Sequence, residues 1–276
     1  MNADAKKLIE LDPWLAPYEN QLWDRIAHTN WMRSQFESLG GLGGLVSHGH
    51  RYFGFNADGS DMVYREWAPN ATWASLIGDF NGWDRGACPM TRDENGIWEA
   101  RLPMAALPHG SLVKLHLATA SGESFDRVPA YITRAIQQPE TGQYVGQIWR
   151  PAEEFSWQNS SPVVDSLRIY EAHVGMAQEH GGVGTYDEFR LHTLPRIAAL
   201  GYNTVQLMAI QEHPYYGSFG YHVSSFYAPS SRFGTPDELK ALVDTAHGLG
   251  LLVIMDLVHS HSVKNIGEGL NQFDGS

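Results

Sequence analysis

The feature that most constrains the fold is an alternation of apolar strands and helices in the second half of the chain. Residues 167–175, 204–210 and 251–258 are short apolar runs, and helical patterns separate them. Strands this apolar are buried on both faces, and consecutive strands joined by a helix pair in parallel through right-handed crossovers. The sequence therefore predicts a parallel α/β sheet from about residue 165 onward.

Both intervening helices have clear start signals. Glu188 follows Thr185 by three residues, which is the spacing of a capping box, and Glu238 follows Thr235 in the same way. In a capping box the hydroxyl and the carboxylate each accept a hydrogen bond from a backbone N–H that the first turn leaves free. Gly250 follows the second helix and is the residue type that most often ends a helix in the left-handed conformation.

The segment from residue 45 to residue 150 has a different pattern. Short alternating or apolar runs, such as those at 62–67 and 112–117, are separated by turn dipeptides such as Asn95-Gly96. Short strands with turn signals at this spacing are typical of a β-sandwich of about 100 residues.

Two further segments complete the organisation. Apolar residues recur at helical spacing within residues 1–44, which end in a glycine-rich stretch. Residues 151–164 contain prolines and a serine pair and have the composition of a linker. The predicted order is a helical segment over 1–44, a sandwich over 45–150, a linker over 151–164 and an α/β domain over 165–276.

The net charge and the cysteine content exclude several classes of function and site. With 19 Lys+Arg against 31 Asp+Glu, the formal net charge is −12, which argues against nucleic acid and anionic membrane surfaces, because both bind basic faces. The single cysteine, Cys88, excludes an internal disulfide framework and a cysteine-based metal cluster. There is no signal-peptide pattern and no apolar run of about 18 residues. We therefore expect a cytoplasmic protein without a membrane span.

Polar side chains follow each of the three predicted strands, at the positions where chemistry gathers in parallel α/β proteins. They are Glu171, His173, Glu212, His213, Tyr215, Tyr216, Tyr221, Asp256, His259 and His261. Asp256 stands out because it lies within an apolar strand, where a carboxylate without a partner costs several kcal/mol. For Glu171, His173 and Glu212 the sequence leaves open whether they are site residues or only hold the strand ends together.

The common cofactor motifs are absent from the sequence. His259 and His261 would need a third ligand to bind zinc, and neither an HExxH helix nor a cysteine partner is available. There is also no GxGxxG, P-loop or GxSxG motif. We therefore expect no metal, no nucleotide cofactor and no α/β-hydrolase site.

Five segments, taken together and in order, resemble one known family. They are 170–175 (YEAHVG), 201–210 (GYNTVQLMAI), 218–221 (SFGY), 231–236 (SRFGTP) and 256–261 (DLVHSH). They resemble the 1,4-α-glucan branching enzymes of the α-amylase superfamily, of the type common in eukaryotes, over about residues 8–276. The resemblance implies a TIM (β/α)8 barrel, of which residues 165–276 would be the first three βα units, because a full barrel takes about 250 residues.

The same family carries a carbohydrate-binding β-sandwich before its barrel. Residues 65–69 (REWAP) and 78–84 (GDFNGWD) resemble that module. The residues that the resemblance assigns to a glucan-binding surface are Trp67, Trp83, Asp84 and Gly96. On such a surface an indole stacks on a sugar ring while polar groups bind the hydroxyls. A place in the sandwich core is the competing interpretation for Trp67 and Trp98.

Within the barrel the resemblance assigns substrate binding to three residues. Tyr221 would be a stacking platform for the sugar at the cleavage point, and His261 would hydrogen-bond that sugar's hydroxyls. Asp256 would hold neighbouring side chains in place rather than react. Ser260 stands where calcium-binding α-amylases have a ligating asparagine, so no calcium is expected there.

The family reaction is a retaining transglycosylation. An Asp nucleophile forms a glycosyl-enzyme, a Glu acts as acid and then base, and a 6-hydroxyl of another glucan accepts the chain. In the family these residues follow the fourth and fifth barrel strands, and a third essential Asp follows the seventh. All three would lie beyond Ser276. The resemblance thus implies an N-terminal portion of an enzyme of glycogen biosynthesis, with α-1,4-glucan as its partner and no catalytic residue of its own.

Two other functions remain open at this level. One is a stand-alone α-glucan-binding module without catalysis, and the other is an α-1,6-debranching amylase. The HSH ending of 256–261 and the YEAHVG strand favour branching over debranching.

Overall fold

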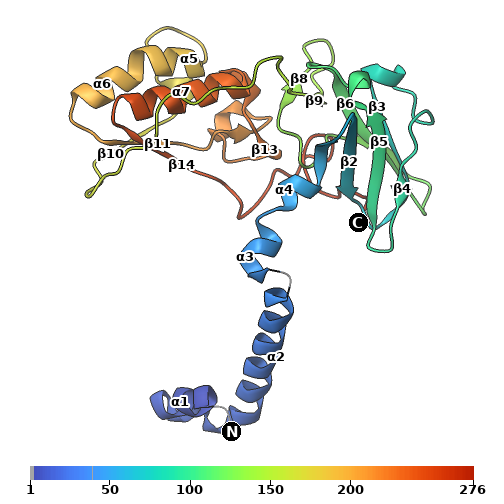
Figure 1. Cartoon of the computed structure of the whole chain (residues 1–276), viewed down its shortest axis with the longest axis vertical. Helices are drawn as coiled ribbons and strands as arrows, with labels where there is room; N and C mark the ends of the chain where they lie inside the picture. The colour runs from blue at the N-terminus through green and yellow to red at the C-terminus, as the bar shows by residue number, and fades with distance from the viewer. Residues whose placement is uncertain (1–2, 39) are drawn as a thin grey trace. The chain divides into compact units, whose positions relative to one another are not determined.

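The computed structural model describes residues 3–38 and 40–276 and contains two compact units, residues 1–52 and 53–276 (Figure 1). The first unit is helical. Its elements are α1 (Ala3–Leu11), the 3₁₀ helix η1 (Pro13–Tyr18), α2 (Glu19–Glu37), α3 (Gly41–Val46) and α4 (Gly49–Tyr52). The glycine-rich stretch at the end of residues 1–44 is itself largely helical, as α3. No residue of α2 is buried within this unit. None of the described helices is long and apolar enough to cross a membrane.

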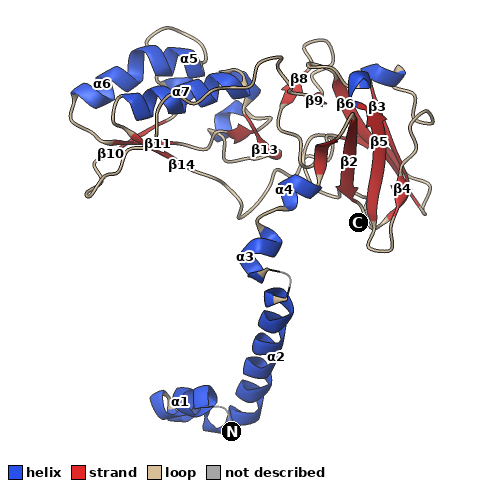
Figure 2. Ribbon diagram, in the orientation of Figure 1, coloured by secondary structure: helices blue, strands red, loops and turns tan. Residues whose placement is uncertain are grey.

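The second unit begins with a sandwich of two antiparallel sheets (Figure 2). One sheet has the order β1-β2-β5-β4, and the other has the order β3-β6-β9-β8 with β7 paired to β6. The strands are β1 (Gly54–Asp58), β2 (Asp61–Trp67), β3 (Ala71–Gly78), β4 (Thr91–Arg92), β5 (Ile97–Pro103), β6 (Leu112–Thr119), β7 (Ser124–Arg127), β8 (Ala135–Gln137) and β9 (Tyr144–Gln147). Short 3₁₀ turns, η2 (Asp79–Asn81) and η3 (Met104–Ala106), follow β3 and β5.

The sandwich core follows from alternation along the strands. In β6, Val113, Leu115 and Leu117 are fully buried, and Leu115 lies opposite Leu76 of β3. Tyr64 and Trp98 add large buried rings from the other sheet. Because successive strand residues point to opposite faces, the same strands turn polar or aromatic side chains outward.

The rest of this unit contains a three-stranded parallel sheet in the order β10-β11-β14, in which Tyr170 lies opposite Val205 and Val205 lies opposite Val253. The elements of this part of the chain, in order, are β10 (Ile169–Ala172), η4 (Val174–Met176), α5 (Tyr186–Glu188), the π-helical turn η5 (Phe189–Thr193), α6 (Leu194–Ala199), β11 (Thr204–Leu207), β12 (Gln211–Glu212), η6 (Tyr216–Ser218), β13 (Ser225–Pro229), η7 (Ser231–Phe233), α7 (Pro236–Gly248) and β14 (Leu252–Met255). In Figure 1, α5, α6 and α7 lie on one face of the sheet.

The predicted parallel sheet and both capping boxes are confirmed. The hydroxyls of Thr185 and Thr235 accept from the backbone N–H groups three residues on, and the glutamates complete each box. Gly250 has φ +77°, so it ends α7 in the left-handed conformation as predicted.

The third strand differs from the prediction. It ends at Met255, so Asp256 lies just beyond it, partly exposed, and not within a buried strand. No helix follows β14 among the described residues. The structure therefore contains three strands and two helical crossovers rather than three full βα units. Residues 263–276, which we call segment 263–276, pack instead against the sandwich, where Phe273 contacts the core.

Residues 151–164 contain neither helix nor strand. They lie along α7, where the Asp244 carboxylate accepts the backbone N–H groups of Gln158 and Asn159, both at 2.9 Å. This contact ties the two halves of the second unit together.

Candidate functional site

Tyr221, Asp256 and His261 meet at the carboxyl end of the parallel sheet. The Tyr221 hydroxyl donates to Asp256 Oδ2 at 2.8 Å, and His261 Nε2 lies 2.8 Å from the Tyr221 carbonyl oxygen. Burial, with the hydrogen bond and charge of Asp256, raises the pKa of Tyr221 to about 12. The phenol therefore stays protonated near neutral pH and donates to Asp256, which holds the hydroxyl in place.

The turn before Tyr221 requires glycine. Gly220 has φ +92°, and a Cβ there would lie 1.9 Å from the carbonyl oxygen of Ala209. Only a residue without a side chain allows this close approach to the strand-end backbone. The turn brings Tyr221 to Asp256, 35 residues further along the chain.

Glu212 is a structural anchor. It is fully buried, and its carboxylate accepts the backbone N–H of Ser231 at 2.6 Å and that of His213 at 3.0 Å. Burial raises the pKa of Glu212, and these hydrogen bonds oppose the rise. Its oxygens are thus engaged in joining β12 to the 3₁₀ turn η7, which leaves little capacity for a ligand.

Glu171 and His173 differ in their surroundings. Glu171 is exposed and accepts a hydrogen bond from the Gln206 amide at 2.8 Å. His173 is buried between the rings of Tyr216, Phe219 and Phe233, and its two ring nitrogens find no hydrogen-bond partner among the described residues. Burial lowers the pKa of His173, so the ring is neutral.

The two candidate tryptophans of β2 and β5 have opposite environments. Trp98 is 4% exposed and donates to the Ala68 carbonyl oxygen, so it is a core residue. Trp67 is 59% exposed, and its indole N–H donates to the Asn95 carbonyl oxygen at 3.1 Å. That hydrogen bond holds the ring in place while leaving it open to solvent.

A pocket of about 250 Å³ adjoins Trp67, and we call it the Trp67 pocket. Its lining residues are Trp67 and Pro69 from the sandwich with Leu270, Gln272, Phe273, Asp274 and Ser276 from segment 263–276. Amide, carboxylate and hydroxyl groups thus surround an aromatic face, which is the combination that binds sugar rings.

Gly96 supports the backbone beneath the Trp67 surface and is not itself exposed there. It is buried, and a Cβ there would lie 2.6 Å from the Cα of Pro69. The neighbouring turn is held by Asp93, whose carboxylate accepts the N–H groups of Asn95 and Ile97. Gly96 thus packs beneath Pro69 and supports the turn that holds Trp67, so its part in a ligand surface would be through that turn.

Trp83 and Asp84 lie at the other end of β3 from Trp67. Trp83 is half-buried, and its indole N–H donates to Asp79 Oδ1 at 3.2 Å. Asp84 is exposed and accepts the N–H of Gly86 at 2.8 Å. The eight residues of β3 separate the two tryptophans by roughly 25 Å at the rise of a strand. The predicted sandwich residues thus occupy two surfaces and not one.

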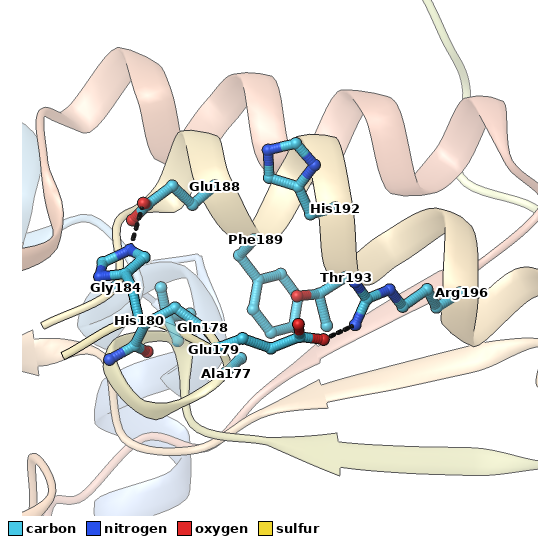
Figure 3. A pocket seen from close by; sticks show the side chains of 11 residues that line it. Ala177, Gln178, Glu179, His180, Gly184, Glu188, Phe189, His192, Thr193 and Arg196 are labelled. Carbon is cyan, nitrogen blue, oxygen red and sulfur yellow. Dashed lines mark hydrogen bonds and ion pairs between the residues drawn. The ribbon is translucent and has the colours of Figure 1, made fainter.

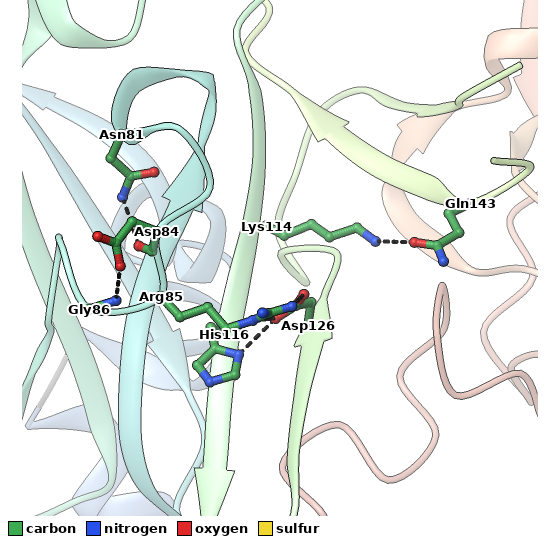
Figure 4. A network of polar contacts seen from close by, with 8 residues as sticks. All are labelled: Asn81, Asp84, Arg85, Gly86, Lys114, His116, Asp126 and Gln143. Atoms are coloured by element: carbon green, nitrogen blue, oxygen red, sulfur yellow. Dashed lines mark hydrogen bonds and ion pairs between the residues drawn. The ribbon is translucent and has the colours of Figure 1, made fainter. Parts of the chain in front are cut away.

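A polar network on the outer face of β6 and β7 was missed by sequence reasoning (Figure 4). Asp126 accepts two hydrogen bonds from Arg85, at 2.7 and 3.1 Å, and lies 2.7 Å from His116 Nδ1. Lys114 lies beside it and donates to Gln143 at 3.4 Å; burial lowers its pKa. Burial opposes ionisation of Asp126, but the hydrogen bonds hold its pKa below the usual value. The sequence signal for this network was the alternation of apolar and polar residues in VKLHL, residues 113–117.

A second pocket, of about 310 Å³, lies between residues 177–184 and the helix from α5 to α6 (Figure 3). Two ion pairs border it, His180 with Glu188 and Arg196 with Glu179, each at 2.7 Å. Because these charges neutralise one another, the pocket has no evident charge preference. None of the predicted site residues lies in it.

Comparison with known proteins assigns both halves of the second unit. Residues 52–132 match carbohydrate-binding module 48, the isoamylase N-terminal domain, and residues 189–269 match the alpha amylase catalytic domain. The solved structure of a putative alpha amylase from Salmonella typhimurium has 25% identity and a TM-score of 0.63 over 80% of this chain and 35% of that one. Pullulanase from Bacillus acidopullulyticus, with 23% identity and a TM-score of 0.61 over 76% of this chain and 30% of that one, shares the fold.

Curated relatives extend the match over nearly all of the chain. A 1,4-alpha-glucan-branching enzyme of Emericella nidulans is 49% identical over 99% of this chain and 41% of its own length. Those of Rhizophagus irregularis and Arabidopsis thaliana (enzyme 2-2, chloroplastic/amyloplastic) are 47% and 49% identical over 98% and 99% of this chain and 40% and 35% of their own. The chain thus spans about two fifths of the length of such relatives. Over nearly its whole length the chain is therefore homologous to a portion of the 1,4-alpha-glucan-branching enzymes of the α-amylase superfamily.

Proposed function

We propose that this chain is a glucan-holding part of a 1,4-α-glucan branching enzyme. The enzyme would transfer a segment of α-1,4-glucan to a 6-hydroxyl of a glucan chain and so form the α-1,6 branches of glycogen. The observation that carries the proposal is the exposed Trp67 ring beside a pocket with uncharged and acidic hydrogen-bonding groups. A neutral polyhydroxylated chain suits such a pocket, whereas an anionic ligand would be repelled by Asp274.

The cluster at the sheet end supplies the second glucan contact in this proposal. The Tyr221 ring would stack on the sugar at the point of cleavage, and His261 would hydrogen-bond its hydroxyls. Asp256 accepts the Tyr221 hydroxyl at 2.8 Å, so its part would be to orient that ring. This division of roles follows from the family resemblance and is supported by the contact among the three residues.

The bond-making groups would be supplied by other parts of the enzyme. Retaining glycosyl transfer uses two carboxyl groups about 5–5.5 Å apart, one of them free to attack the sugar. Glu212 is buried and engaged by backbone N–H groups, and Asp256 is engaged by Tyr221. We therefore propose that β10, β11 and β14 are the first three strands of a (β/α)8 barrel whose later strands carry the catalytic carboxylates.

Affinity electrophoresis in glycogen gels tests glucan binding. The chain should be retarded, and Trp67→Ala should weaken the binding about tenfold, because it removes the stacking face. The matched control is Trp157→Ala, since Trp157 is a comparably exposed tryptophan, at 53%, on the linker. Equal binding by Trp67→Ala and the unsubstituted chain would refute the Trp67 assignment.

The iodine spectrum of amylose tests the proposal that the catalytic groups lie outside this chain. The purified chain should leave the spectrum unchanged, because the strand-end carboxylates Glu212 and Asp256 are both engaged in hydrogen bonds. A clear spectral shift on incubation with the chain alone would show that the catalytic groups lie within these 276 residues.

A further inference from the structure

Arg127, at the end of β7, is an arginine in the sandwich interior with only 1% of its surface exposed. A charge at this depth is costly unless hydrogen bonds replace its hydration. The guanidinium lies over the Phe125 ring, 4.5 Å from its centroid. It donates Nε to the Phe273 carbonyl oxygen at 3.0 Å, Nη1 to that of Ile266 and Nη2 to that of Gln272.

All three carbonyl groups belong to segment 263–276, which lies 139–146 residues further along the chain. The guanidinium fork thus holds a segment that has no helix or strand of its own. A second anchor joins the same segment to the sandwich. The backbone N–H of Asn70 donates to Asp274 Oδ2 at 2.8 Å, and its side-chain amide donates to the Asp274 carbonyl oxygen at 3.1 Å.

The residues held in this way are those that form one wall of the Trp67 pocket. Arg127 binds the carbonyl groups of Gln272 and Phe273, and these two residues line the pocket. Arg127 itself is not part of the lining. Of the residues that line the pocket, only Trp67 and Pro69 belong to the sandwich, so the amide, carboxylate and hydroxyl groups of the lining all come from the segment.

We propose that Arg127 is a positioning residue for carbohydrate binding, which completes the Trp67 pocket by holding segment 263–276 against the sandwich. The inference rests on the proposed function, since it concerns the same pocket. The segment begins two residues after His261, and the N–H of Val263 donates to the Val223 carbonyl oxygen at 2.9 Å, close to Tyr221.

Isothermal titration of the 276-residue chain with maltoheptaose tests the proposal. Arg127→Lys keeps the charge but replaces the planar fork with one ammonium group, which cannot reach three separate carbonyl oxygens. We expect about tenfold weaker binding of maltoheptaose. Asn70→Ala removes only one side-chain hydrogen bond at an exposed position, and we expect about threefold weaker binding.

Arg134→Lys is the matched control for a loss of stability. Arg134 is partly buried, and like Arg127 it donates to a distant backbone carbonyl oxygen, that of Gly234 at 2.9 Å and 100 residues away, but it does not line the Trp67 pocket. Its substitution should lower the melting temperature as Arg127→Lys does, yet leave maltoheptaose affinity within about twofold. Equal losses of affinity in the two variants would reduce Arg127 to a general stabilising role.

Hydrogen exchange measures the protection that the ligand gives to the segment, which a change in stability alone would not alter. Maltoheptaose should slow exchange at the amides of residues 263–276 in the unsubstituted chain and much less in Arg127→Lys. If Arg127→Lys does not fold, the maltoheptaose affinity and the hydrogen exchange of Asn70→Ala test the proposal instead. Unchanged affinity and protection in the folded variants overturn the role of Arg127, whereas unchanged affinity in Trp67→Ala overturns the proposed glucan site itself.

Discussion

At the scale of single residues, two neighbours in β2 show how strand geometry separates structural from surface roles. Glu66 points inward and Trp67 points outward, because successive side chains in a strand face opposite ways. Glu66 is 2% exposed and accepts hydrogen bonds from the Tyr64 hydroxyl at 2.9 Å and the Ala130 N–H at 2.8 Å. Burial outweighs these bonds and raises the pKa of Glu66 to about 7.

This shift predicts a pH dependence of stability. The folded-state pKa of about 7 lies above the ordinary value of 4.5, so the folded chain retains a proton that the unfolded chain has released. The contribution of Glu66 to stability is therefore largest below pH 4.5, falls as the pH rises toward 7 and is constant above that. Glu66→Gln should flatten the melting temperature over this range relative to the unsubstituted chain.

The control for that measurement is the exposed Glu94→Gln. Its melting temperature should follow that of the unsubstituted chain at every pH. If Glu66→Gln keeps the slope of the unsubstituted chain between pH 4.5 and 7, another group is responsible.

At the scale of elements, local sequence signals set the helix starts but not the helix interiors. After Thr185 the chain forms α5, then the wider π turn η5, and then α6. Pro195, in the first turn of α6, has no N–H to donate four residues back, and a wider preceding turn absorbs this break. The capping box was predictable because its partners are three residues apart, whereas the π turn depends on how both flanking helices pack on the sheet.

The capping box of α7 makes a quantitative prediction. Thr235 Oγ1 accepts the Glu238 N–H at 3.2 Å, and Glu238 accepts the Thr235 N–H at 2.6 Å. Thr235→Ala should lower the free energy of unfolding by about 1 kcal/mol, as urea titration would measure. Thr235→Ser retains the hydroxyl and should lose much less. Equal losses in both variants would mean that the threonine methyl group, and not the cap, stabilises α7.

At the scale of the whole molecule, the parallel sheet has two edges that no strand pairs with among the described residues. β10 and β14 are the outer strands, and apolar side chains are exposed on or beside them. Ile169 and Met255 are 42% and 47% exposed. Unpaired apolar edges bind other strands, so the isolated chain should self-associate as its concentration rises.

Ile169→Lys tests this expectation, because a lysine on an edge strand opposes strand pairing between molecules. Light scattering after size-exclusion chromatography should show a smaller associated fraction than for the unsubstituted chain. The control is Val163→Lys, which changes an apolar residue that is 96% exposed on the linker. A similar decrease in both variants would point to net charge rather than to the sheet edge.

The sequence by itself determined the parallel sheet and the helix starts, and its motifs indicated the resemblance to branching enzymes. These features depend on residues close together in the chain or on motifs with characteristic side chains. Tyr221, Asp256 and His261 could be named from strand ends and from the resemblance, but their contact depends on the turn at Gly220. Only the tertiary structure separated the exposed Trp67 from the buried Trp98, because exposure depends on which face of a strand meets the core. It alone showed the role of Arg127, since the partners of that side chain are backbone carbonyl groups, which every residue carries and no sequence pattern marks.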